Sequence, residues 1–238
     1  MADSSVCMFC GSSPGSDPVF LEAAADVGRA IAARGWRLVY GGGQRGCMGE
    51  VSSAALKAGG RVLGVMPKTM IAKIRRPAGE NDTGDAPSTS NEGEGSRTLK
   101  AAPQDAHRLE SIAVESMHER KQIMADQSGL GFIGLPGGFG TFEEVLEMTT
   151  WSQLGIHRKP MILVNINGFF TPLKALIDQA VSSGFIHAEN TSLVTFVDVD
   201  ADWGKHVVEA VEREGRQISS TQGYWDWDAK DNKDSTVN

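Results

Sequence analysis

The stretch GLGFIGLPGGFGTFEE (residues 129–144) decides the fold, because it places a short apolar run directly before a glycine-rich turn and an amphipathic segment. Residues 129–135 have the length and apolar character of a buried strand. After the turn, apolar residues recur at helical spacing: Phe142, Val145, Leu146 and Thr149. The stretch therefore predicts a strand-to-helix turn, where the unpaired N–H groups of the first helical turn and the helix dipole favour a bound anion.

The same alternation of apolar runs and amphipathic segments fills most of the chain. Further strands are expected over residues 5–10, 37–40, 61–66, 161–166 and 193–199, with helices near residues 18–34 and 48–58. This order predicts an α/β protein with a Rossmann-like, three-layer α/β/α fold around a central parallel sheet. Glycine clusters follow three of the strands, at residues 11–15, 41–49 and 137–140. Because parallel strands end at one edge of the sheet, these clusters are expected to face one crevice.

One Rossmann-like domain is expected to span residues 1–238, since the chain is 40% hydrophobic and long enough to bury a substantial core. Residues 75–103 break the pattern. They are dominated by small, polar and charged residues and contain one large aliphatic residue, Leu99, so we expect a disordered insertion there. A polar tail is expected from about residue 216.

A formal net charge of −7 argues against a nucleic-acid partner, because no concentrated basic stripe offsets it. No run of residues is long and apolar enough to predict a membrane span, and Met1 to Ser5 lacks a basic or apolar targeting signal. Three cysteines cannot pair completely. We therefore expect a cytoplasmic protein without a membrane partner.

Neither a metal nor a cofactor is expected. The five histidines are scattered singly, without metal-ligand spacing. The glycine clusters match neither the dinucleotide-binding fingerprint nor the phosphate-binding loop of nucleotide triphosphatases. Cys7 and Cys10 fall within the first predicted strand, where two small buried residues are the favoured interpretation.

Arg120 and Lys121 form the first candidate chemical pair. Ser116 and Glu119 have the spacing of a capping box, so a helix is predicted to begin here. Cations in a first helical turn oppose the helix dipole, which invites a functional explanation. The alternative is that both side chains extend over the core edge or form a surface ion pair.

Glu144 is the second candidate. Thr141 and Glu144 also have capping-box spacing, so the carboxylate is predicted either to close back on the Thr141 backbone or to face the crevice. In the second case the helix N-terminus is expected to lower its pKa and keep it ionised, able to stabilise a developing cation. Glu143 is its neighbour and a possible partner.

Residues 136–144 fit the pattern Pro-Gly-Gly-x-Gly-Thr-x-x-Glu. In this pattern the chain resembles the Lonely Guy family of cytokinin riboside 5′-monophosphate phosphoribohydrolases. Similarity continues through five further segments, over most of residues 5–215: Cys10 to Ser13, Tyr40 to Gly43, Gly46 to Gly49, Met117 to Lys121 and Thr150 to His157.

The resemblance implies hydrolysis of the N-glycosidic bond of N6-substituted adenosine 5′-monophosphates, or of AMP, by a homodimer or a higher homo-oligomer. It implies catalytic roles for Arg120 and Glu144 and substrate contacts at Lys121, Gly138 to Glu144 and Thr150. The glycine clusters add further candidate substrate-binding residues: Ser12, Gly42, Gly43 and Gly137. Two alternatives stay open, a nucleotide or cofactor carrier without catalysis and an amino-acid decarboxylase, which would need a lysine that forms a Schiff base.

Overall fold

The computed structural model describes residues 4–75 and 103–218, and within them it contains a seven-stranded sheet in which every neighbouring pair is parallel. The strand order is β4-β3-β2-β1-β5-β6-β7. The strands are β1 (Ser5–Phe9), β2 (Arg37–Tyr40), β3 (Arg61–Pro67), β4 (Leu109–Val114), β5 (Gly131–Gly134), β6 (Met161–Val164) and β7 (Val194–Val197). The predicted α/β fold with a parallel sheet is confirmed.

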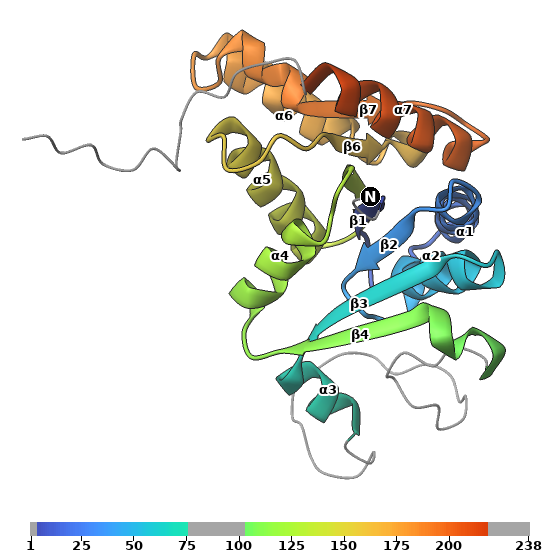
Figure 1. Cartoon of the computed structure of the whole chain (residues 1–238). Helices are drawn as coiled ribbons and strands as arrows, with labels where there is room; N and C mark the ends of the chain where they lie inside the picture. The colour runs from blue at the N-terminus through green and yellow to red at the C-terminus, as the bar shows by residue number, and fades with distance from the viewer. Residues whose placement is uncertain (1–3, 76–102, 219–238) are drawn as a thin grey trace, which may run out of the picture.

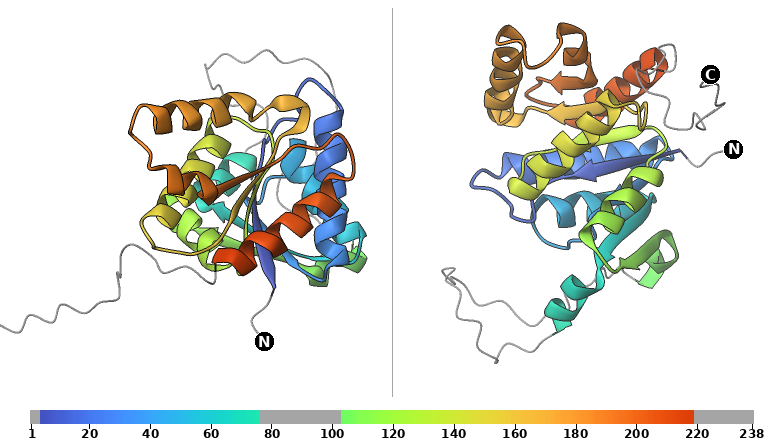
Figure 2. Two further views of the ribbon diagram at one scale, coloured as in Figure 1. Left: turned by 90° about the horizontal axis from the view of Figure 1, so that it is seen from above. Right: turned by 90° about the vertical axis from the view of Figure 1, so that its left-hand side faces the viewer.

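Helices cover both faces of the sheet and complete the three layers (Figure 1). One face carries α1 (Val19–Ala33), α2 (Gly46–Lys57) and α7 (Trp203–Ile218). The other carries α4 (Met117–Asp126), α5 (Phe139–Gln153) and α6 (Thr171–Ser182), and the right-hand view of Figure 2 looks onto α4 and α5. Helix α3 (Lys68–Arg75) follows β3 and projects beside the sheet edge that ends in β4. Three short 3-10 helices lie at Pro103–Arg108, Ile166–Gly168 and Ala188–Leu193.

The core lies in two layers, one on each face of the sheet. Val6 and Met8 of β1 belong to the layer under α1, α2 and α7, whereas Cys7 and Phe9 belong to the layer under α4 and α5. All four side chains are buried, because a parallel sheet covered on both faces hides alternate residues equally. The sheet therefore gives the loops at its carboxyl edge a rigid base.

Strand β4 is absent from the sequence prediction. It pairs residues 109–114 with residues 62–67 of β3 at the edge of the sheet. Its side chains are mostly exposed or half-buried, with Val114 the only buried one. An edge strand that includes Glu110 and Ser111 lacks the continuous apolar run that identifies a central parallel strand.

The predicted insertion at residues 75–103 lies outside the described residues except at its ends, where Arg75 closes α3 and Pro103 opens a 3-10 helix. Helix α7 continues to Ile218, so the start of the tail predicted from about residue 216 overlaps the end of this helix. Residues 219–238 lie outside the described residues. Among the described helices, none is both long and apolar enough to cross a membrane.

His157 is a half-buried histidine in the segment between α5 and β6, and the fold favours its neutral form. Its ring tilts onto Phe132 at a centroid distance of 5.1 Å, and its Nδ1 accepts from the Lys159 N–H at 3.2 Å. Burial, followed by the positive charge of Lys159, lowers the pKa of His157 from 6.5 to about 4. Between pH 4 and pH 6.5, His157 is therefore protonated in the unfolded chain and neutral in the folded chain.

Stability is accordingly expected to fall as pH drops from 6.5 to 4, by about 3 kcal/mol from this group alone. Urea unfolding across that range measures it. His157→Gln should flatten the difference between pH 6.5 and pH 4, because the titrating group is gone. An equally steep decline in the variant would assign the acid sensitivity to other residues.

Candidate active site

The candidate site lies where the winding of the sheet reverses direction. From β1 the chain proceeds outward through β2, β3 and β4, then returns to the other side of β1 with β5. The loops after β1 and β5 thus lie side by side, and the Gly11 N–H donates to the Pro136 carbonyl at 3.0 Å. The Met48 N–H of α2 donates to the Gly11 carbonyl at 3.2 Å. This is the position at which open α/β sheets bind ligands.

A cleft of about 590 Å³ opens at this point, a size typical of small-molecule sites. All three predicted glycine clusters contribute to its lining, through Gly11, Gly41, Gly43, Gly138 and Gly140. The prediction that they face one crevice is confirmed. Side chains that can bind or react also line it: Ser12, Arg120, Thr141, Glu143 and Glu144.

One end of the cleft is formed by the N-terminus of α5. The helix begins at Phe139 with Gly138 as an extended N-cap residue, and its first internal hydrogen bond runs from the Phe142 N–H to the Gly138 carbonyl at 3.1 Å. The N–H groups of residues 139–141 precede that bond and have no acceptor within the helix. The open helix end therefore offers donors and partial positive charge to the cleft.

The predicted capping box of Thr141 and Glu144 is wrong. Helix α5 begins two residues before Thr141, so Thr141 lies inside the first turn and no side chain caps the helix. The threonine is buried, and a Cβ atom on Gly137 would lie 2.1 Å from its Oγ1. Glycine at position 137 is thus required for the turn to pack against Thr141.

Helix α4 positions Arg120, and here the predicted helix start with Ser116 as its cap is confirmed. The Glu119 N–H donates to the Ser116 Oγ at 3.1 Å, and the Glu119 carboxylate accepts from the Glu115 N–H at 2.7 Å. These bonds fix the start of the helix, so that Arg120, four residues after the cap, points at the sheet and is buried. The cation is buried in the first turn because it has a specific partner.

That partner is Glu144. Arg120 Nη1 donates to Glu144 Oε1 at 2.8 Å, and Arg120 Nε donates to the Val65 carbonyl at 3.1 Å. Each residue is only 8% exposed, although both line the cleft. A Cβ atom on Gly41 would lie 2.0 Å from Arg120 Nη2, so only glycine at position 41 leaves room for the guanidinium. The pair is held in one geometry by β2, β3, α4 and α5.

The pKa of Glu144 is shifted in the direction opposite to the prediction. Burial raises it, and the charge of Arg120 opposes that rise. The helix N-terminus was expected to lower the pKa, but removal of the carboxylate from water outweighs the favourable charges. Arg120 therefore favours the ionised form of Glu144 against the effect of burial.

Lys121 has a different environment from Arg120. Its Nζ contacts Glu143 Oε1 at 2.5 Å and Glu147 Oε2 at 2.9 Å, and these two hydrogen bonds raise its pKa. Lys121 is not among the residues that line the cleft. It joins α4 to α5 beside the Arg120–Glu144 pair, whereas the family resemblance implied a nucleotide contact.

Other predicted binding residues lie around the cleft in distinct places. Phe139 lines the rim and is 92% exposed, whereas Phe142 stacks on Phe169 at a centroid distance of 6.1 Å. Gly137 lines an adjoining cavity of about 260 Å³ below the loop after β1. Gly42 has a φ of +76° and packs against Met66.

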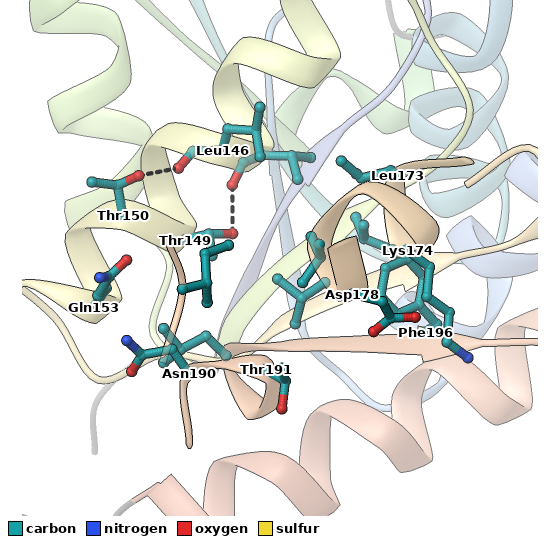
Figure 3. A pocket seen from close by; sticks show the side chains of 16 residues that line it. Leu146, Thr149, Thr150, Gln153, Leu173, Lys174, Asp178, Asn190, Thr191 and Phe196 are labelled. Carbon is teal, nitrogen blue, oxygen red and sulfur yellow. Dashed lines mark hydrogen bonds between the residues drawn. The ribbon is translucent and has the colours of Figure 1, made fainter. Parts of the chain in front are cut away.

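Thr150, like Lys121, Gly42, Gly137 and Phe142, is not among the residues that line the cleft. It lies six residues beyond Glu144, about 9 Å along the helix axis, and its Oγ1 donates to the Leu146 carbonyl at 2.8 Å. It lines a separate cavity of about 270 Å³ between α5, α6 and β7 (Figure 3). Within one chain, Thr150 therefore lines the cavity beside α6, whereas Glu144 lines the cleft.

Sequence reasoning missed the methionines of the cleft, Met48, Met66, Met70 and Met117, and the carbonyl of Val65 that orients Arg120. The methionines come from separate helices and strands, so no spacing along the chain relates them. A backbone acceptor carries no sequence signal at all.

Comparison with known proteins gives consistent results. A family model described as "Possible lysine decarboxylase" matches residues 48–207, and a model of the "SLOG cluster4 family" matches residues 6–77. A cytokinin riboside 5′-monophosphate phosphoribohydrolase of Arabidopsis thaliana is 39% identical over 226 residues, which are 95% of this chain and 89% of the relative. A probable cytokinin riboside 5′-monophosphate phosphoribohydrolase of Oryza sativa subsp. japonica is 38% identical over 223 residues, 94% of this chain and 78% of the relative.

Solved structures of similar fold are more distant in sequence. The molybdenum cofactor carrier protein of Chlamydomonas reinhardtii has a TM-score of 0.57 at 20% identity, covering 89% of this chain and 98% of the other. The molybdenum cofactor binding protein of Rippkaea orientalis has a TM-score of 0.55 at 19% identity, covering 90% and 98%. At this identity the similarity extends to the fold alone.

Proposed function

Because the chain belongs to the Lonely Guy family, in which the relatives of about 40% identity are named cytokinin riboside 5′-monophosphate phosphoribohydrolases, we propose that it hydrolyses the N-glycosidic bond of N6-substituted adenosine 5′-monophosphates. The products are the free base and ribose 5-phosphate. One observation carries the proposal: Arg120 and Glu144 form a buried ion pair that lines the cleft beside the open N-terminus of α5.

The chemistry follows from this arrangement. The N–H groups of residues 138–141 and the Thr141 hydroxyl hold the 5′-phosphate, as helix N-termini do for anions. The ribose then lies over Glu144. As the bond between C1′ and the base nitrogen breaks, the ribose gains oxocarbenium character, which a carboxylate stabilises. Water supplies the new hydroxyl on C1′, and a proton goes to the departing base.

Arg120 acts by orientation. A guanidinium stays protonated at neutral pH, so it cannot serve as the base that activates water. Its contacts with Glu144 and the Val65 carbonyl hold the carboxylate in place and favour the ionised form. In this assignment Glu144 stabilises the positive charge that develops on the ribose, and Arg120 holds the Glu144 carboxylate in position.

Two glycines of the turn support a ligand at the helix end. A Cβ atom on Gly138 or Gly140 would meet no protein atom within 4 Å, and neither residue has a positive φ. Protein packing therefore does not require glycine at these positions. In this proposal glycine is needed there because a side chain would keep the phosphate away from the backbone N–H groups.

Gly140→Ala is expected to fold normally and to raise the KM for nucleotide about tenfold, because the methyl group keeps the phosphate from the N–H groups and costs roughly one hydrogen bond to a charged group. Steady-state kinetics and thermal unfolding measure the two effects. Thr149→Ala, on the same helix outside the cleft, is the control. Unchanged KM in Gly140→Ala would place the phosphate elsewhere.

Product analysis tests the reaction class. Purified protein is incubated with AMP and with several N6-modified adenosine monophosphates, and free base is quantified by chromatography. Release of base supports the proposal. Recovery of all ligand intact after long incubation, from protein that is folded and binds it, would favour the carrier alternative.

The decarboxylase alternative fits the environment of Lys121 poorly. A lysine that forms a Schiff base must lose its proton readily, which a lowered pKa provides. The two carboxylates beside Lys121 raise its pKa instead. An absorbance spectrum recorded after addition of pyridoxal phosphate, without an aldimine band, would exclude this function.

We also propose a single domain over residues 1–238, a homodimer and a cytoplasmic location. The dimer is supported by the apolar surface that Phe139 and Leu146 expose along α5, which light scattering can test. All three cysteines are free and buried, which suits a reducing compartment. Fractionation of cells that express the protein tests the location.

A further inference from the structure

Four methionines line the cleft: Met48, Met66, Met70 and Met117. They come from four separate elements, α2, β3, α3 and α4. We call this set the methionine wall. Its members converge on the cleft from distant parts of the sequence.

Two members of the methionine wall, Met70 and Met117, are exposed and do not belong to the hydrophobic core. Met70 is 49% exposed and Met117 is 44% exposed, whereas Met66 is buried. Met66 and Met48 also pack against the glycine segment after β2: a Cβ atom on Gly42 would lie 3.0 Å from Met66 Cε, and one on Gly43 would lie 2.9 Å from Met48 Cε. Packing thus explains the inner pair. The outer pair, Met70 and Met117, leaves apolar surface open to the cleft.

The wall adjoins the reacting pair. A Cβ atom on Gly41 would contact both Arg120 Nη2, at 2.0 Å, and Met48 Sδ, at 3.4 Å. Arg120 and Met48 therefore both lie next to Gly41. The polar part of the cleft comprises the helix end at Gly138 to Thr141, then Glu144 and Arg120, and the apolar part begins directly beside Arg120.

A nucleotide whose phosphate lies at the helix end and whose ribose lies at Glu144 must extend its base away from α5. This step rests on the proposed function. We propose that the methionine wall receives an apolar N6 substituent on the base, and that Met70 and Met117 set the preference for such nucleotides over AMP. An unsubstituted amino group leaves these two side chains in water.

Methionine suits this role because its unbranched, polarisable side chain adapts to ligands of different shape. A wall of four methionines is expected to accept both branched aliphatic and flat aromatic substituents. It is expected to discriminate against charged ones, which gain nothing from an apolar surface. The substrate class is therefore broad among apolar N6 groups.

The test compares kcat/KM for N6-isopentenyladenosine 5′-monophosphate with that for AMP. In the double variant Met70→Gln with Met117→Gln, the ratio of the two values is expected to fall at least about tenfold, the size of effect that a lost apolar contact has on specificity. Met70→Leu with Met117→Leu should keep the ratio within about threefold, because apolar surface is retained. Leu176→Gln, which is 60% exposed on α6 and does not line the cleft, controls for a general effect of surface polarity.

Three results would overturn the inference: an unchanged ratio in the glutamine variant, an equal loss for both substrates, or an equal change in the leucine variant. Thermal unfolding of each variant excludes a trivial loss of folded protein. Failure of the proposed function has a different signature, since the wild-type protein would then release base from neither nucleotide.

Discussion

Glu144→Gln is expected to lower kcat about a thousandfold while the nucleotide still binds. The substitution keeps the shape of the side chain and its hydrogen bond with Arg120 but removes the negative charge that the oxocarbenium-like transition state requires. A group that acts mainly on the transition state affects kcat more than binding. Loss of one such electrostatic contact typically costs a hundredfold to a thousandfold, roughly 3 to 4 kcal/mol.

Glu143→Gln is the matched control, because it removes the adjacent carboxylate on the same helix turn. Glu143 lines the cleft and pairs with Lys121, but it has no contact with Arg120 among those that the structure describes. Its substitution should reduce kcat far less. Equal effects of the two substitutions would contradict the assignment of Glu144 as the group that meets the developing charge.

Arg120→Ala is expected to impair both stability and catalysis. Removal of the guanidinium leaves the Glu144 carboxylate buried without its partner, and breaking a buried ion pair in this way typically costs about 3 to 5 kcal/mol. The pKa of Glu144, already raised by burial, rises further when the opposing charge is removed. The acid limb of any residual kcat/KM profile should therefore move to higher pH.

Gly41→Ala separates the two effects of Arg120. Its Cβ atom would lie 2.0 Å from Arg120 Nη2 and so displaces the guanidinium without removing its charge. We expect a large loss of kcat with a smaller loss of stability than in Arg120→Ala. Urea unfolding and steady-state kinetics on both variants measure this. Wild-type kcat in Arg120→Ala would show that Arg120 has no part in the reaction.

The strands near the centre of the sheet could be predicted from the sequence because burial on both faces gives them continuous apolar runs. Residues 37–40 were predicted with the observed bounds, and residues 61–66 within one residue. Edge strand β4 could not, since half of its side chains face solvent. Edge position alone does not explain this, because β7 lies at the other edge and was predicted over residues 193–199. Its run Val-Thr-Phe-Val lacks the charged residue that interrupts β4.

The site was partly predictable. The glycine clusters and the residues Arg120 and Glu144 could be identified as candidates, but not the bond between them, because it joins α4 and α5 across 24 positions of the chain. The direction of the Glu144 pKa shift was predicted wrongly because it depends on burial, which the sequence does not give. The capping box at Thr141 failed because the glycine turn lets α5 begin earlier.

Lys121 and Thr150 match family positions that imply nucleotide contacts, and these contacts stay predictions. In the structure Lys121 joins two glutamates and Thr150 lines the cavity beside α6. The methionine wall could not be predicted from the sequence. No pattern along the chain relates its four members, and only the fold brings them to one surface.

The most direct test of the account is to incubate wild-type protein and Glu144→Gln with N6-isopentenyladenosine 5′-monophosphate and to quantify free base and ribose 5-phosphate in the same samples. The account predicts that the wild-type protein releases both products in equal amounts with repeated turnover, and that the variant binds the nucleotide but releases almost none. Equal product release by the two proteins, or intact nucleotide recovered from folded wild-type protein, would contradict it.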